Sequence, residues 1–170
     1  EQVRLVQEGK ISAVALVQTQ LDEINRLNPL LNSFITVDAD GALEQARAID
    51  KARENGAKLG PLAGATIGVK DSIPTKGLRT TDNSRLLENW IPQEDASTVK
   101  RLREAGAIII GKTNLNEFGW SRPSETDLMP PPWSPWNPNR MSVGSSSGSG
   151  AATTARMAAA TIGTDGGGSA

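Results

Sequence analysis

The stretch Ala65-Thr66-Ile67-Gly68-Val69-Lys70-Asp71 decides the expected fold of this chain. It is short, apolar and partly β-branched, which is typical of a buried strand, and we expect the strand to end at Lys70. Residues 107–110 have the same character and predict a second buried strand. Residues 33–37 predict a further short strand earlier in the chain.

Helical patterns surround the first short strand. Apolar residues recur at intervals of three and four between residues 14 and 24, after the N-cap residue Ser12, and predict an amphipathic helix. We expect this helix to stop at Asn28-Pro29, because the residue before a proline disfavours the helical conformation. Residues 39–55 predict a second helix, with Gly56 at its C-cap.

The later part of the chain alternates in the same way. Asp95 is expected to cap a helix over residues 95–105, and Gly106 separates that helix from the strand at residues 107–110. The Ala-rich residues 149–161 suit a helix that packs closely against a sheet. Strands that alternate with helices predict an α/β fold.

A proline-rich segment interrupts this alternation. Residues 122–138 contain six prolines, and we expect a long ordered loop there, because proline donates no backbone hydrogen bond. Trp120, Trp133 and Trp136 lie in or beside this segment. They either line a substrate entrance, which would suggest a bulky apolar acyl or aryl group, or pack at the surface.

The composition excludes several kinds of catalytic site. The 170 residues contain no His and no Cys, so a Ser-His-Asp triad, a Cys-His pair and a Cys/His zinc site cannot be built within this chain. The net charge of -1 gives no electrostatic argument for binding nucleic acid or a membrane surface. No apolar run approaches the roughly 18 residues of a membrane span, and the absence of Cys fits a cytoplasmic protein.

One motif points to a function that its context contradicts. Gly106-Ala107-Ile108-Ile109-Ile110-Gly111-Lys112-Thr113 matches the phosphate-loop pattern G-x-x-x-x-G-K-S/T. A phosphate loop needs its variable positions in a turn, whereas Ala-Ile-Ile-Ile favours a strand. We therefore interpret these residues as structural, and we expect Thr113-Asn114 to open a helix.

Ser169 is a candidate nucleophile for amide hydrolysis, which requires a nucleophile, a base, an acid for the leaving amine and donors for the oxyanion. It follows Gly166, Gly167 and Gly168, whose lack of side chains lets backbone N–H groups approach a substrate carbonyl. These glycines are therefore candidate oxyanion donors. A glycine-rich turn with an incidental serine is the alternative interpretation.

Lys70 is the candidate base. A lysine at the end of an apolar strand either extends to solvent or is buried, and burial lowers its pKa so that a neutral amine can accept a proton. Asp71 is a possible ion-pair partner. Ser145 either links Lys70 to a distant serine, since a hydroxyl donates and accepts at once, or satisfies nearby backbone as a loop hydroxyl. Residues 144–150, read alone, have the composition of a flexible linker.

These segments occur in an order that resembles the amidase signature family of amide hydrolases. Gly60-Pro61-Leu62-Ala63-Gly64, leading to Val69-Lys70-Asp71, resembles the lysine motif of that family. Gly144-Ser145-Ser146 and Gly163-Thr164-Asp165-Gly166-Gly167-Gly168-Ser169 resemble its serine motifs. The resemblance covers residues 12–170 and implies one mixed sheet with helices on both sides, of which residues 1–170 form the N-terminal part of a single domain.

The resemblance also implies roles for individual residues. Lys70 would be the base, Ser145 the bridging serine in a cis peptide, and Ser169 the nucleophile that forms an acyl-enzyme. Gly166, Gly167 and Gly168 would bind the oxyanion, with Ser146 and Asp165 in supporting roles. No metal or organic cofactor is implied.

The substrate implied is a small-molecule amide, aryl amide or carbamate, and the protein could be a homodimer. Three alternatives remain: an amidotransferase A-type subunit that supplies ammonia in a complex, a carbamate or urea-type hydrolase, and a catalytically silent fragment. The chain departs from the family at Thr80-Thr81-Asp82-Asn83-Ser84, where Asn83 replaces a glycine of the usual T-T-x-G-S. Asparagine tolerates the left-handed backbone conformation better than most residues.

Overall fold

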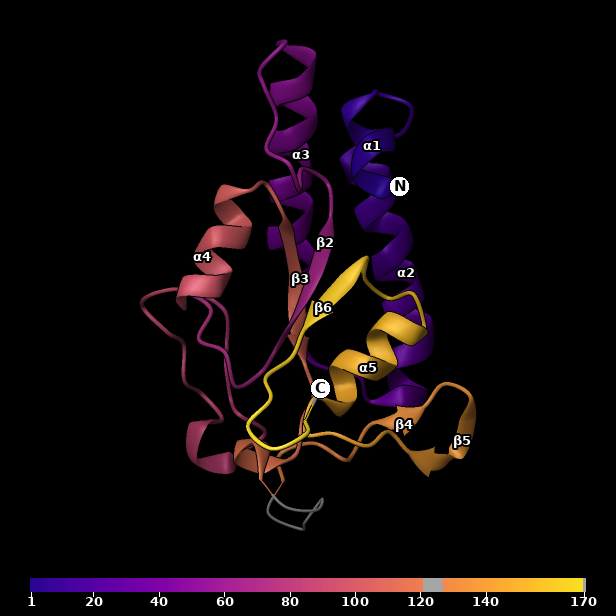
Figure 1. The fold of residues 1–170 in the computed structure, drawn as a ribbon, viewed down its shortest axis with the longest axis vertical. Helices are drawn as coiled ribbons and strands as arrows, with labels where there is room; N and C mark the ends of the chain where they lie inside the picture. Colours follow the sequence, from indigo (N-terminus) through magenta and orange to yellow (C-terminus); the bar gives the residue numbers. More distant parts are fainter. Residues whose placement is uncertain (121–126, 170) are drawn as a thin grey trace.

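A mixed four-stranded sheet lies at the centre of the computed structural model, which describes residues 1–120 and 127–169 (Figure 1). The strand order is β1 (Phe34–Val37), β3 (Ile108–Thr113), β2 (Thr66–Lys70) and β6 (Ala160–Ile162). β1 runs antiparallel to β3, whereas β3 and β6 both run parallel to β2. The α/β class and the mixed sheet are confirmed, as are the three strands expected from the sequence.

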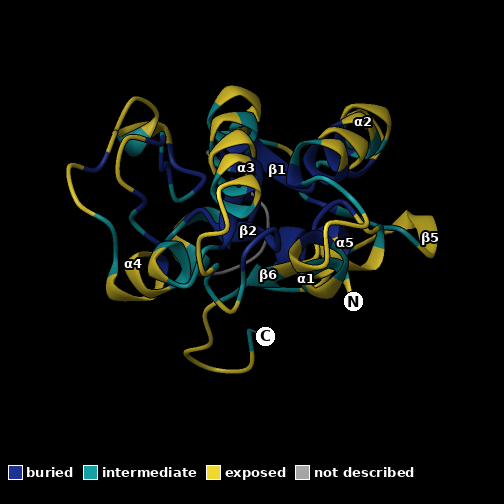
Figure 2. Cartoon of the chain, turned by 90° about the horizontal axis from the view of Figure 1, so that it is seen from above, coloured by how far each residue is buried: buried dark blue, intermediate teal, exposed yellow. Residues whose placement is uncertain are grey.

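Helices cover both faces of this sheet. Figure 2 shows α2 and α3 next to β1, with α4 across the sheet from them. The described helices are α1 (Gln2–Gln7), α2 (Ala13–Leu31), α3 (Ala39–Glu54), α4 (Ser97–Glu104) and α5 (Ser147–Thr154), with short 3-10 turns η1 (Arg85–Leu87) and η2 (Glu117–Gly119). None of these described helices has the length and apolar character needed to cross a bilayer.

The alternation of side chains along β3 divides the apolar core in two. Ile108 and Ile110 are fully buried in a cluster with α2, α3 and α5. Ile109, between them, belongs to a second cluster with Ile67 and Val69, beneath α4. Because successive side chains of a strand point to opposite faces, a run of three isoleucines supports a helical layer on each side.

Two expected helix boundaries are wrong. α2 continues through Pro29 to Leu31 and ends where Asn32 adopts a left-handed conformation, with φ of 50°. Pro29 lies in the last turn, and the Asn28 side chain holds the following strand by bonding the N–H and the carbonyl of Phe34. The disfavoured backbone before proline is therefore offset by local hydrogen bonds.

Asp95 does not cap α4, whose N-cap residue is Ala96 without a side-chain hydrogen bond. The Asp95 carboxylate instead accepts a hydrogen bond from the backbone N–H of Lys76 at 2.7 Å and pairs with Arg103 at 3.2 Å. It therefore ties the start of the helix to the preceding loop. Sequence position alone did not distinguish these two uses of a carboxylate.

The Ala-rich residues 149–161 do not form a single helix. α5 ends at Thr154, and the chain reverses through Arg156, which has a φ of 58°. Residues 160–162 then form β6 and pair with β2. The β-branched Thr161 and Ile162 favour a strand more than the preceding alanines do, which is a local signal that the helical interpretation overlooked.

The proline-rich segment contains regular structure, contrary to expectation. β4 (Trp133–Ser134) and β5 (Asn137–Met141) form a two-stranded antiparallel ribbon, while residues 122–126 lie outside the described part of the chain. Proline is compatible with a two-stranded ribbon because a residue on the outer edge of a strand does not have to donate a backbone hydrogen bond to a neighbouring strand. Trp133 packs against the first core cluster, and Trp136 projects from the ribbon with 86% of its surface exposed.

The phosphate-loop pattern lies within a strand, as its apolar composition predicted. Residues 108–113 form β3, and Lys112 is fully buried. Thr113-Asn114 does not open a helix, because the Asn114 side chain donates to the carbonyls of Asn32 and Pro130 instead. That contact fastens the end of β3 to the segments on either side.

Gly148 allows α5 to sit directly on the end of β3. A Cβ atom built at Gly148 would lie 2.5 Å from the backbone N and O atoms of Asn114 and from the carbonyl oxygen of Ser33. Gly150, in the same helix, would place its Cβ in open space. The missing side chain at Gly148 therefore sets how closely the helix that follows Ser145 approaches the sheet.

We expect Gly148→Ala to destabilise the protein by about 1–3 kcal/mol, because the methyl group overlaps backbone that cannot give way. Gly150→Ala is the matched control, and it should be neutral or stabilising by about 0.5–1 kcal/mol, since alanine favours a helix interior. Urea denaturation midpoints of the longest natural form of the protein measure both effects. Equal midpoints for the two variants would contradict this account of helix placement.

Candidate active site

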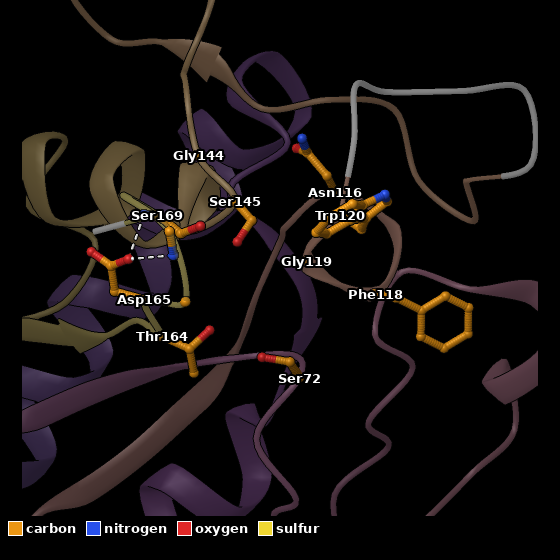
Figure 3. A pocket seen from close by; sticks show the side chains of 12 residues that line it. Ser72, Asn116, Phe118, Gly119, Trp120, Gly144, Ser145, Thr164, Asp165 and Ser169 are labelled. Atoms are coloured by element: carbon orange, nitrogen blue, oxygen red, sulfur yellow. Dashed lines mark hydrogen bonds between the residues drawn. The ribbon is translucent and has the colours of Figure 1, made fainter.

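The carboxyl ends of three parallel strands meet at one edge of the sheet. β2 ends at Lys70, β3 leads into residues 114–120, and β6 leads into residues 163–169. A cavity of about 610 Å³ opens there, lined by Ser145, Ser169 and Trp120 among others (Figure 3). Parallel strands place their following loops on the same edge, which explains how residues distant in sequence share one cavity.

Lys70 is buried and does not extend to solvent. Its Nζ donates hydrogen bonds to Ser145 Oγ at 2.7 Å, to Ser146 Oγ at 3.0 Å and to the carbonyl of Thr164 at 3.3 Å. These three contacts satisfy the amine and link the end of β2 to the start of α5 and to the glycine-rich loop. Of the two environments that the sequence left open for Lys70, extension to solvent and burial, the structure shows burial.

Asp71 is not the partner of Lys70, contrary to the sequence-based suggestion. Its carboxylate accepts hydrogen bonds from the N–H and the hydroxyl of Thr81, at 2.8 and 2.5 Å, and lies 3.8 Å from Lys112 Nζ. Neighbouring residues at a strand end point to opposite faces, so Asp71 faces away from the amine of Lys70.

A β-bulge places the second buried lysine on the opposite face of the sheet. The pairing of β2 with β3 shifts so that Ile67 faces Ile109 and Gly68 faces Gly111, which leaves Ile110 as the extra residue. Lys112 Nζ consequently donates to the carbonyl of Ile73 and to two threonine hydroxyls beneath the α4 side. Burial lowers the pKa of Lys112 to about 8.

Burial also lowers the pKa of Lys70, because removing an ammonium group from water disfavours its charged form. The carboxylates of Asp82 and Asp165 act in the opposite direction and raise the pKa of Lys70. Asp82 itself is perturbed, since burial and the nearby Asp71 raise its pKa to about 6. The sequence analysis did not single out Asp82, which reaches this position through a left-handed backbone, with φ of 52°.

Ser146 connects α5 to the glycine-rich loop. Its backbone N–H donates to the carbonyl of Ser169 at 3.0 Å, and its hydroxyl donates to the carbonyl of Thr164 at 3.1 Å. The expected cis peptide at Ser145 is wrong, because all peptide bonds in the described ranges are trans. The hydroxyls of Ser145 and Ser146 both reach Lys70 from this trans backbone.

The glycine-rich loop folds around one carboxylate oxygen. Asp165 Oδ1 accepts hydrogen bonds from the N–H groups of Gly167, Gly168 and Ser169, at 3.0, 2.5 and 2.9 Å. Gly168 has a φ of 100°, a conformation that a side chain would strain. Three N–H groups that converge on one point form an anion-binding nest, and here an internal carboxylate occupies it.

Ser169 lies in the same cavity as Ser145, but the two side chains are not joined. Among the described residues, no hydrogen bond connects Ser169 Oγ with Ser145 Oγ, and Ser169 is held through its backbone. Figure 3 shows Ser145 between Ser169 and Asp165 on one side and Trp120 on the other. Ala170 lies outside the described residues. The contacts therefore join Lys70 to Ser145, while Ser169 is close to them in a preformed loop.

A sequence profile of the Amidase family matches residues 15–170. The chain belongs to the amidase family. It is 43% identical over 169 residues to the A-type subunit of the glutamyl-tRNA(Gln) amidotransferase of Acidothermus cellulolyticus, covering 99% of this chain and 34% of that relative. The chain thus spans about one third of the length of the curated relatives that it matches.

Solved amidases share the fold. A bacterial aryl acylamidase of the amidase signature enzymes superposes with a TM-score of 0.87 and 25% sequence identity, over 93% of this chain and 33% of that chain. The A-type subunit of the glutamyl-tRNA(Gln) amidotransferase from Thermotoga maritima gives a TM-score of 0.73 and 37% identity, over 89% of this chain and 30% of that chain. Enzymes named for hydrolysis and for amide transfer therefore both resemble this chain.

Proposed function

We propose that this chain supplies the Lys70, Ser145 and Ser169 side chains of an enzyme that cleaves an amide-type carbon–nitrogen bond through a serine acyl-enzyme. The observation that carries the proposal is the 2.7 Å contact between buried Lys70 Nζ and Ser145 Oγ, beside a cavity that also contains Ser169. A desolvated amine can act as a base, and a hydroxyl can pass a proton by donating and accepting together.

In the first half-reaction, neutral Lys70 takes the proton of Ser145 as Ser145 takes that of Ser169. The freed electron pair of Ser169 Oγ forms a bond to the substrate carbonyl carbon, and the carbonyl oxygen becomes an oxyanion. Collapse of the tetrahedral intermediate breaks the carbon–nitrogen bond, and the amine leaves with the proton returned through Ser145. A water molecule, deprotonated by the same relay, then hydrolyses the ester and restores Ser169.

The oxyanion requires N–H donors at a fixed point. The N–H groups of Gly167, Gly168 and Ser169 already converge, but on Asp165 Oδ1. We assign Asp165 a supporting role, because its carboxylate holds these donors in one orientation. Asp165 must release at least part of this contact before the same donors can receive a substrate oxygen.

An amidotransferase subunit is the second candidate function, favoured by the 43% identity to the A-type subunit of the Acidothermus cellulolyticus amidotransferase. Both functions use the same cleavage step, and they differ in whether ammonia is released or delivered to an acceptor. Assays of the longest natural form with an aryl amide and with glutamine, together with a search for a co-purifying subunit, distinguish them. Turnover of glutamine only in the presence of such a subunit would favour the amidotransferase.

Ser169→Ala should abolish acyl-enzyme formation and lower turnover by roughly 10⁴-fold, because it removes the nucleophilic oxygen. Labelling with a fluorophosphonate probe and steady-state rates of the longest natural form measure the loss. Ser134→Ala, in the β4–β5 ribbon, is the matched control and should behave as the unmodified protein. Retained turnover in Ser169→Ala would refute the nucleophile, and an unlabelled unmodified protein would favour the catalytically silent alternative.

Activity should rise with pH along a limb that reports Lys70, because only the neutral amine accepts a proton. Burial lowers the pKa of Lys70, so the limb should lie below the pKa of a free lysine. Asp82→Asn removes a carboxylate that raises this pKa and should move the limb to lower pH. Profiles of kcat against pH measure the direction in which the limb moves. Asp22→Asn, on the exposed side of α2, is the control and should leave the limb in place. A limb that moves upward or stays in place in Asp82→Asn would contradict the assignment.

A further inference from the structure

One wall of the cavity carries an exposed aromatic side chain. Trp120 lines the cavity with 80% of its surface exposed, which is unusual for an indole. In Figure 3 it lies on the side of Ser145 opposite Ser169, whereas the Phe118 ring points away from the serines. Trp133 and Trp136 are absent from the described lining, so Trp120 is the tryptophan of this region that faces the site.

The backbone beside Trp120 is fixed against the serine. Gly119 has a φ of 66°, and a Cβ built there would lie 3.4 Å from Ser145 Oγ. The N–H of Trp120 donates to the carbonyl of Glu117 at 3.1 Å, and that of Phe118 donates to the carbonyl of Asp82 at 3.0 Å. The indole therefore extends from a hydrogen-bonded turn that touches the proposed relay.

Asn83 secures both ends of the segment that carries Trp120. It is fully buried, with a φ of 53°. Its Nδ2 donates to the carbonyl of Leu115 at 2.7 Å, and its Oδ1 accepts from the N–H of Met129 at 2.7 Å. A glycine at this position would adopt the same backbone conformation without these side-chain bonds.

The described wall of the cavity carries little charge. Among the described residues that line it, Asp165 is the one ionisable side chain, and three N–H groups already engage Asp165 Oδ1. The described wall thus offers no cationic side chain to pair with the α-carboxylate of an amino acid amide such as glutamine. An uncharged flat group placed on the indole would bury apolar surface on both partners.

We propose that Trp120 is a specificity-determining residue that stacks on an aryl or similarly flat, uncharged group next to the scissile bond, and that Asn83 is its positioning residue. This inference rests on the proposed amide cleavage and names its substrate class. It distinguishes the protein from one that acts on glutamine alone, because glutamine offers no such group.

The test compares kcat/KM for an anilide and for a small aliphatic amide in the longest natural form. Trp120→Ala should lower the anilide-to-aliphatic ratio by roughly 10-fold, mainly through KM, while Trp120→Phe should keep most of it. Asn83→Gly should also lower the ratio, although it touches no substrate. Trp136→Ala, which removes a similarly exposed indole that is not part of the described cavity lining, is the control and should leave the ratio unchanged. An unchanged ratio in Trp120→Ala would overturn the inference and leave amide cleavage standing.

A binding measurement separates this inference from the proposed chemistry. Titration of the Ser169→Ala variant with the anilide should change its tryptophan fluorescence, and the change should be lost when Trp120→Phe is added to that variant. An identical change in both proteins would overturn the stacking role. An anilide that binds through Trp120 but is never cleaved by the unmodified protein would refute the proposed function while the aromatic subsite stands.

Discussion

The hydrogen bonds of buried Lys70 are the interaction on which this edge of the molecule depends. Removing an amine from water is unfavourable unless it is hydrogen-bonded, and Lys70 finds its partners in Ser145, Ser146 and the carbonyl of Thr164. These partners come from two segments, the start of α5 and the loop after β6. The amine of Lys70 can therefore make all three hydrogen bonds only when the end of β2, the start of α5 and the loop after β6 are all in place.

The bulge in β3 keeps the two buried lysines independent. If the same residues continued past Ile109 in regular alternation, without the bulge at Ile110, Lys112 would lie on the other face of the sheet. With it, Asp71 lies 3.8 Å from Lys112, and the amine of Lys70 is bonded to hydroxyl and carbonyl oxygens instead. The register shift therefore gives the two amines separate partners: Lys112 lies near the Asp71 carboxylate, whereas the Asp82 and Asp165 carboxylates raise the pKa of Lys70.

Short-range sequence patterns predicted the helices and strands whose apolar side chains are buried in the core. The isoleucines of β3 and the spaced apolar residues of α2 are examples, because the burial of these side chains largely determines how each element packs. The division of residues 149–161 between α5 and β6 was missed because the alanines of this segment favour a helix and outweighed the β-branched Thr161. The burial of Lys70, the use of Asp71 by Lys112 and the nest around Asp165 depend on contacts over long sequence distances, which spacing alone does not reveal.

The turn at Asp82 and Asn83 shows how one local conformation serves two parts of the site. Both residues are left-handed, with φ of 52° and 53°, and their side chains act on different partners. The Asp82 carboxylate acts on the charge of Lys70, while Asn83 bonds the segment that carries Trp120. A glycine could adopt this backbone at either position but would supply neither contact. Two adjacent residues therefore act on two parts of the candidate site, Asp82 on the charge of Lys70 and Asn83 on the backbone at Leu115 and Met129.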